Sequence, residues 1–215
     1  MNNQKLVIID TGCANLASVR MAFERLGVQP QVSCQAADIE QADKLILPGV
    51  GNFADCIEQL EKDGWVEELK SQVLGGGKSL LGVCVGMQLL ATCSAEGSPS
   101  ADGEQHPGGL GFVPGRVEHL RQLGCGLRVP HVGWNSVRGI AEQEGLFAGI
   151  PEGTDFYFVH SYAYVPDDPA DSIAVADYGT TFTAAVRRGN VWGTQFHPEK
   201  SGDVGEIILG NFLKL

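Results

Sequence analysis

The first half of the chain alternates short apolar runs with segments whose apolar residues recur every three or four positions. Short, β-branched apolar runs are typical of buried strands, and the wider spacing is typical of amphipathic helices. We therefore expect strands at residues 5–9, 31–34, 43–47 and 78–83, and helices at 16–26, 53–62, 65–74 and directly after Cys84. Strands that alternate with helices predict an α/β fold with an open, mostly parallel sheet flanked by helices.

The pattern changes after about residue 95, where a polar segment rich in glycine and proline begins. Beyond this segment the chain is mainly strand-like. We expect strands at 111–117, 156–160, 173–178, 183–187 and 191–195, and a last helix at about 203–213. These strands would extend the sheet in antiparallel fashion. Neither half is large enough to stand alone, so we predict one domain over residues 1–215.

The composition argues against several classes of function. The formal net charge of −11 and the pI of about 4.8 disfavour binding to nucleic acid or to a membrane surface, which require a cationic face. The six cysteines have neither CxxC nor zinc-type spacing, so we expect reduced thiols, no metal and no cofactor. The sequence has no signal-type leader and no apolar run of ~18–20 residues, which predicts a cytoplasmic protein.

One cysteine lies between two glycines at the junction of an expected strand and helix, in the segment Gly82-Val-Cys84-Val-Gly86. A sharp strand-to-helix turn of this type lifts a nucleophile above the sheet, and its flanking residues must be small. The N–H groups that begin the helix favour a thiolate, and the N–H of Val85 is placed to bind a developing oxyanion. A buried cysteine in an ordinary turn is the alternative interpretation.

Two further segments supply candidate partners for this thiol. His197 ends an expected strand and is followed by Pro198 and Glu199, so the carboxylate is close enough to support the imidazole as a general base. The segment 48–51, Pro-Gly-Val-Gly, follows another strand and should lie at the same edge of the sheet, where open α/β folds bind ligands. A structural histidine and an ordinary β-turn are the alternatives.

Together these three segments resemble the class I glutamine amidotransferases, which have a flavodoxin-like α/β fold. That family hydrolyses the side-chain amide of glutamine with a Cys-His-Glu triad and passes the ammonia to a partner site. The resemblance implies Cys84 as nucleophile, His197 as base and acid, and Glu199 as the residue that orients the histidine. It also implies an oxyanion hole formed by backbone N–H groups at Val50 and Val85. The implied glutamine-binding residues are Gly49, Gly51, Gln88, Glu96, His160, Ser161 and Tyr162.

Other segments narrow the resemblance to one branch, the glutaminase subunits of imidazole glycerol phosphate synthases in histidine biosynthesis. These segments are Pro130-His-Val-Gly-Trp-Asn135 and Val159-His-Ser-Tyr162. The branch implies a heterodimer with a (β/α)8 cyclase subunit, which uses the ammonia to make imidazole glycerol phosphate and an aminoimidazole carboxamide ribotide (AICAR). The residues implied at or near that interface are Asn15, Trp134, Tyr162 and Lys200. For Trp134, a position in the core is the alternative.

Three other functions fit parts of the sequence. A stand-alone cysteine hydrolase or protease would need no partner, although the Pro-Gly-Val-Gly and Met-Gln segments argue against it. A non-catalytic binding domain would be expected to have lost part of the triad, which the sequence retains. The glutaminase of anthranilate or pyridoxal-phosphate synthesis is disfavoured by the segments at 130–135 and 159–162.

Because glycines flank Val50, we expect a flip of the peptide bond there to cost little free energy. A partner that favours the flipped form would then complete the oxyanion hole and switch the activity on.

Overall fold

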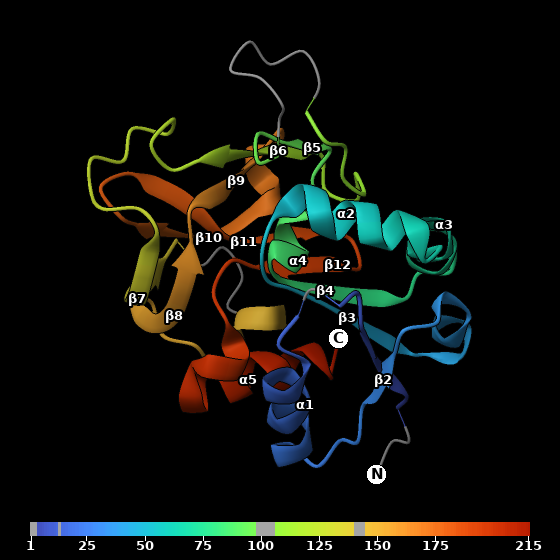
Figure 1. Ribbon diagram of the computed structural model, residues 1–215. Helices are drawn as coiled ribbons and strands as arrows, with labels where there is room; N and C mark the ends of the chain where they lie inside the picture. The colour runs from blue at the N-terminus through green and yellow to red at the C-terminus, as the bar shows by residue number, and fades with distance from the viewer. Residues whose placement is uncertain (1–3, 13, 98–105, 140–144) are drawn as a thin grey trace.

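The protein is built around a sheet whose centre is parallel, as the first half of the sequence predicts. The computed structural model describes residues 4–12, 14–97, 106–139 and 145–215. Five strands lie side by side in parallel at the centre (Figure 1). In spatial order they are β2 (Gln31–Ser33), β1 (Leu6–Ile9), β3 (Lys44–Gly49), β4 (Ser79–Cys84) and β12 (Val191–Thr194). The carboxyl ends of β3, β4 and β12 therefore meet at one edge.

The second half of the chain extends this sheet with antiparallel strands. Beyond β12 the order is β11 (Thr181–Arg188), β10 (Ser172–Asp177), β7 (His131–Arg138) and β8 (Thr154–His160). A side branch contains β5 (Cys93–Ser94), β6 (Gly115–His119) and β9 (Tyr162–Pro166), and β9 joins it to β11. The fold class predicted from the sequence is confirmed.

Helices cover both faces of the parallel part. α1 (Leu16–Arg25) and α5 (Gly202–Phe212) pack together on one face, and α2 (Phe53–Lys62) and α3 (Trp65–Leu69) lie on the other (Figure 1). α4 (Val85–Gln88) follows β4 directly. Short 3-10 segments occur at 36–41, 145–147, 169–171 and 198–200, and a π-helical turn at 70–75. Among the described residues, no helix has the length and apolar character needed to span a membrane.

The buried residues explain these elements. Every residue of β1 and β3 is buried, as expected for strands covered on both faces. In α2 the apolar residues Phe53, Ile57 and Leu60 face the core. The side chain of Asn52 caps this helix by accepting hydrogen bonds from the N–H groups of residues 54 and 55, so α2 begins where the sequence predicts.

Three expectations about element bounds are wrong. The helix expected at 65–74 is α-helical only to Leu69 and continues as a π turn. The helix after Cys84 is a single turn, because the chain turns away again at Leu89. The strand expected at 111–117 begins only at Gly115, since Gly111 has a φ of +67° and breaks the extended chain. Strands β5, β7 and β9 were not expected.

Candidate active site

Cys84 occupies the sharp turn between β4 and α4 that the glycine pattern predicts. Its φ of +57° is the one positive value among the described non-glycine residues. Such a conformation costs free energy and is typical of a nucleophile elbow. Both flanking glycines are required: a Cβ on Gly86 would lie 1.8 Å from the carbonyl oxygen of Leu47, and one on Gly82 would lie 2.5 Å from the Gly86 oxygen.

His197 and Glu199 lie beside the elbow because β12 pairs with β4 in parallel register, with Gly193 opposite Gly82. His197 Nδ1 is 2.8 Å from Glu199 Oε1, which leaves Nε2 for the cysteine. Burial lowers the pKa of His197, but hydrogen bonds to Cys84 and Glu199, and their charges, raise it to about 9. The imidazole is therefore protonated at neutral pH and can stabilise a thiolate.

Two contacts to Cys84 were not predicted from the sequence. The thiol donates to the carbonyl oxygen of Val159 at 3.6 Å, and Gln195 Nε2 lies 3.8 Å from the sulfur. Gln195 lies two residues before His197, and this closeness in the sequence was the available signal. The contact with Val159 joins residues 75 positions apart and has no local signal.

The candidate oxyanion loop follows β3. Val50 is exposed, and Gly51 has a φ of +105° that favours glycine. The carbonyl oxygen of Val50 accepts a long hydrogen bond of 3.7 Å from the thiol of Cys56 in α2. Gly49 is buried and does not line the cavity. It packs against the elbow, since a Cβ there would lie 2.7 Å from the Gly86 nitrogen.

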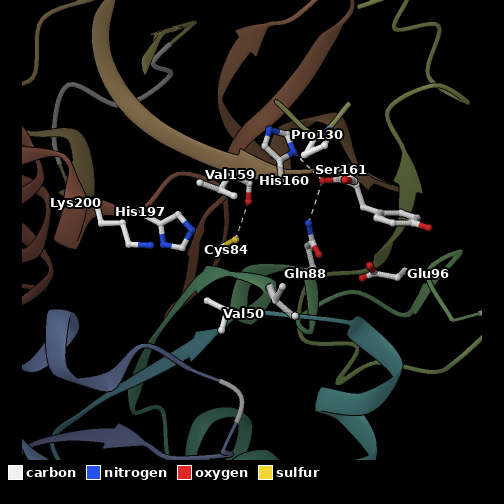
Figure 2. Close-up of a pocket in the computed structure, with 13 residues that line it drawn as sticks. Val50, Cys84, Gln88, Glu96, Pro130, Val159, His160, Ser161, His197 and Lys200 are labelled. Carbon is white, nitrogen blue, oxygen red and sulfur yellow. Dashed lines mark hydrogen bonds between the residues drawn. The ribbon is translucent and has the colours of Figure 1, made fainter. Parts of the chain in front are cut away.

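A cavity of about 250 Å³ opens in front of Cys84. Figure 2 shows Cys84 with His197 on one side and Gln88 and Glu96 on the other. Of the candidate residues, the cavity brings together Val50, Gly51, Cys84, Val85, Gln88, Glu96, His160, Ser161, Tyr162, His197 and Lys200, and it adds Pro130 and Val159. Gly49, Asn15, Trp134 and Glu199 do not line it.

Glu96 places a carboxylate in this cavity. Burial raises the pKa of Glu96, while a 2.9 Å hydrogen bond from the N–H of Phe53 lowers it. The same bond ties Glu96 to the first turn of α2, next to the candidate oxyanion loop.

A group of three or more acidic, histidine or cysteine side chains able to hold a metal is absent from the described residues.

Two buried histidines form the wall behind the cavity. His160 Nδ1 lies 2.8 Å from the carbonyl oxygen of Tyr162, so this nitrogen carries the proton. Its Nε2 then accepts from His131 Nδ1 at 3.0 Å, and Asn135 approaches the other nitrogen of His131 at 3.4 Å. Burial lowers the pKa of His131 to about 4 and that of His160 to about 3, so both are neutral at pH 7.

We expect this histidine pair to make the fold acid-sensitive. Because each pKa is lowered on folding, the unfolded chain binds protons first as the pH falls below about 6.5. Each histidine then removes about 1.4 kcal/mol of the free energy of unfolding per pH unit, or roughly 4 kcal/mol in total at pH 5. Urea unfolding between pH 7 and 5 measures this. His131→Asn should flatten the slope and His106→Asn, at an exposed position, should not; equal slopes would contradict the assignment.

An apolar surface lies outside this wall. Val132 and Trp134 of β7 are 56% and 57% exposed, and their cross-strand partners are Val159 and Tyr157 of β8. The exposure rules out a core position for Trp134.

Asn15 is also exposed, and its side chain caps α1 by accepting from the N–H of residue 18 at 3.5 Å.

The sequence matches the family described as "Glutamine amidotransferase class-I" over residues 7–214. The chain belongs to this family. Among class I amidotransferase relatives, the chain is 47% identical over 211 residues to a protein of Syntrophotalea carbinolica named imidazole glycerol phosphate synthase subunit HisH, covering 96% of this chain and 98% of that protein. It is 46% identical over 215 residues to the Vibrio vulnificus protein named subunit HisH 1, with both chains fully covered.

Solved structures show the same amidotransferase fold. One described as "Structure of PurLQS from Thermotoga maritima" superposes with a TM-score of 0.75 at 16% identity and covers 98% of both chains. Another, described as "Crystal structure of glutamine amidotransferase", has a TM-score of 0.73 at 20% identity and covers 97% of both chains. At these identities the likeness concerns the fold alone.

Proposed function

We propose that this protein is the glutaminase subunit of an imidazole glycerol phosphate synthase. It hydrolyses glutamine to glutamate and ammonia, and supplies the ammonia to a cyclase subunit that makes imidazole glycerol phosphate and AICAR in cytoplasmic histidine biosynthesis. The observation that carries the proposal is the alignment of Cys84, His197 and Glu199 at a cavity that holds Glu96. Relatives at 41–47% identity, named HisH subunits, support it. The whole chain would act as one amidotransferase domain.

The proposed reaction begins with attack of the Cys84 thiolate on the amide carbon of glutamine. The oxygen becomes an oxyanion, which backbone N–H groups at Val50 and Val85 would stabilise. His197 then donates its proton to the departing nitrogen, and ammonia leaves with formation of a thioester. A water molecule that gives its proton to His197 hydrolyses the thioester, and glutamate is released. Glu199 keeps Nε2 of the imidazole directed at the sulfur.

The rest of the cavity fits the other end of glutamine. Glu96 would pair with the substrate ammonium, because it is the carboxylate that faces the cavity opposite Cys84 (Figure 2). The segment 160–162 would hold the rest of the substrate, and the side-chain oxygen of Gln88, whose nitrogen already donates to Tyr162 and Gln195, is an acceptor beside it. Glu96 also accepts from the first turn of α2, so substrate binding and the oxyanion loop share one support.

The proposed partner is a (β/α)8 cyclase subunit in a heterodimer. The exposed pair Val132 and Trp134 is a suitable apolar anchor, since aromatic residues dominate interface energetics. Asn15, Tyr162 and Lys200 complete the proposed contact region. Val50 is also exposed, so a partner docked there is able to act on the oxyanion loop directly.

The test is glutamate release from glutamine by this protein alone, and then with a cyclase subunit and its ligand. We expect a rise of about 10²–10³-fold, the usual worth of one oxyanion donor. Full activity of the isolated chain would instead indicate a free-standing hydrolase. No activity under either condition would indicate a binding domain, and either result would overturn the proposal.

A further inference from the structure

The side chain of Gln195 contacts the candidate nucleophile Cys84 from outside the cavity. Gln195 is completely buried and is not among the residues that line the cavity. Its Nε2 lies 3.8 Å from Cys84 Sγ, and its Oε1 accepts a 2.9 Å hydrogen bond from Gln88 Nε2. Gln195 therefore approaches the sulfur without occupying space that a substrate would use.

The orientation of the Gln195 amide follows from its neighbours. Gln88 Nε2 is also 3.0 Å from the carbonyl oxygen of Tyr162, which can only accept. Turning the Gln88 amide around would place two acceptor oxygens against each other, so its nitrogen must stay where it is. Gln88 Nε2 then uses its second proton on Gln195 Oε1. The nitrogen of Gln195 must in consequence face Cys84, and it presents an N–H to the sulfur.

The Tyr162 carbonyl that anchors this arrangement is itself fixed. It accepts a second hydrogen bond, from His160 Nδ1 at 2.8 Å, and His160 is in turn held by His131. Both lone pairs of the carbonyl are thereby used. The side chains of Gln88 and Gln195 are both buried, and their hydrogen bonds fix the orientation of each amide. A buried polar network whose members are paired in this way holds one arrangement of its side chains.

The two new contacts of Cys84 respond oppositely to ionisation. The carbonyl oxygen of Val159 accepts a hydrogen bond from the neutral thiol. It cannot donate to a thiolate, and its partial negative charge repels the anionic sulfur. The N–H of Gln195 is a weak donor to a neutral thiol and a much stronger one to an anion, because charge-assisted hydrogen bonds are roughly twice as strong as neutral ones. Gln195 therefore stabilises the form of Cys84 that attacks.

We propose that Gln195 is a further residue of the reaction, which donates a hydrogen bond to the Cys84 thiolate and is held in place by Gln88. The role rests on the proposed glutaminase function, but the contact itself concerns only the ionisation of Cys84. It adds a donor to the one provided by His197, on a side of the sulfur that the substrate does not reach.

The test is the rate of Cys84 alkylation by iodoacetamide as a function of pH, in the full-length protein, with modification quantified on the Cys84 peptide by mass spectrometry. We expect Gln195→Met and Gln195→Leu to move the midpoint of this profile upward by about one pH unit. Thr194→Val is the matched control. Thr194 is buried in the same segment and its hydroxyl donates to the Phe196 carbonyl rather than to Cys84, so its midpoint should stay unchanged.

Glutaminase kinetics give a second readout. Because Gln195 lies outside the cavity, its variants should lose about tenfold in kcat with little change in KM, whereas a general loosening of the site would change both. If the leucine variant fails to fold, the flexible methionine variant decides. A folded Gln195→Met protein with the wild-type midpoint would overturn the proposal, as would an equal shift in Thr194→Val. Absence of glutaminase activity in the wild type would refute the proposed function and leave the alkylation result interpretable.

Discussion

Replacement of Cys84 by alanine is expected to abolish glutamate release, with a loss of at least about 10⁴-fold in kcat with the partner present. The reason is chemical: the proposed thioester cannot form without the sulfur. The strained φ of +57° shows that the backbone is held in this conformation at a free-energy cost, which a purely structural cysteine would not require. Release of glutamate is measured by a coupled glutamate dehydrogenase assay.

Three further variants make the measurement decisive. Cys34→Ala, at an exposed cysteine directly after the outer strand β2, should keep full activity. His197→Ala should lose nearly as much as Cys84→Ala, and the double variant should lose little more, because residues that act as one unit are non-additive. A residual activity of Cys84→Ala above about one per cent would be a loss no larger than removal of one oxyanion donor causes. That result would mean that the reaction does not pass through this thiol.

Gly86→Ala should have the largest effect on folding. A Cβ at this position would lie 1.8 Å from the carbonyl oxygen and 2.8 Å from the carbonyl carbon of Leu47, and both belong to the backbone of β3. The central sheet cannot move by the distance needed, since β3 is buried and paired on both sides. We expect the free energy of unfolding to fall by about 4 kcal/mol or more, or the protein to fail to fold.

The control is Gly210→Ala in α5, where the added methyl would have one neighbour at 4.0 Å. Alanine at a helix position with room should stabilise by up to about 1 kcal/mol. Urea unfolding of both variants, followed by circular dichroism, gives the comparison. Equal stabilities would show that the contact between the elbow and β3 is looser than the structure indicates.

The parallel half could be predicted from the sequence because its apolar runs are buried on both faces and leave a continuous signal. The antiparallel half was harder. β7 exposes Val132 and Trp134 and buries His131, so its pattern is the reverse of an ordinary surface strand. Its cross-strand pairing, with β8 on one side and β10 on the other, defines it as a strand.

The candidate triad could be proposed from motifs because each of its segments is local: a turn between glycines and a His-Pro-Glu sequence. What the sequence could not supply is contact between distant segments. The thiol contact with Val159, the link from Glu96 to α2 and the amide pair of Gln88 and Gln195 all join residues more than 40 positions apart. Their partners are set by the three-dimensional packing of the sheet.

The position of β12 has a consequence for the order in which the protein is made. This strand lies between β4 and β11 at the centre of the sheet, yet it comes after all the other described strands in the sequence. A nascent chain can assemble the four preceding parallel strands, but their edge at β4 stays open until residues 191–194 are available. His197 and Glu199 follow that strand, so an incomplete chain has the cysteine without its proposed base. Translation therefore completes the candidate triad only when it also completes the centre of the sheet, and we expect an unfinished chain to hydrolyse no glutamine.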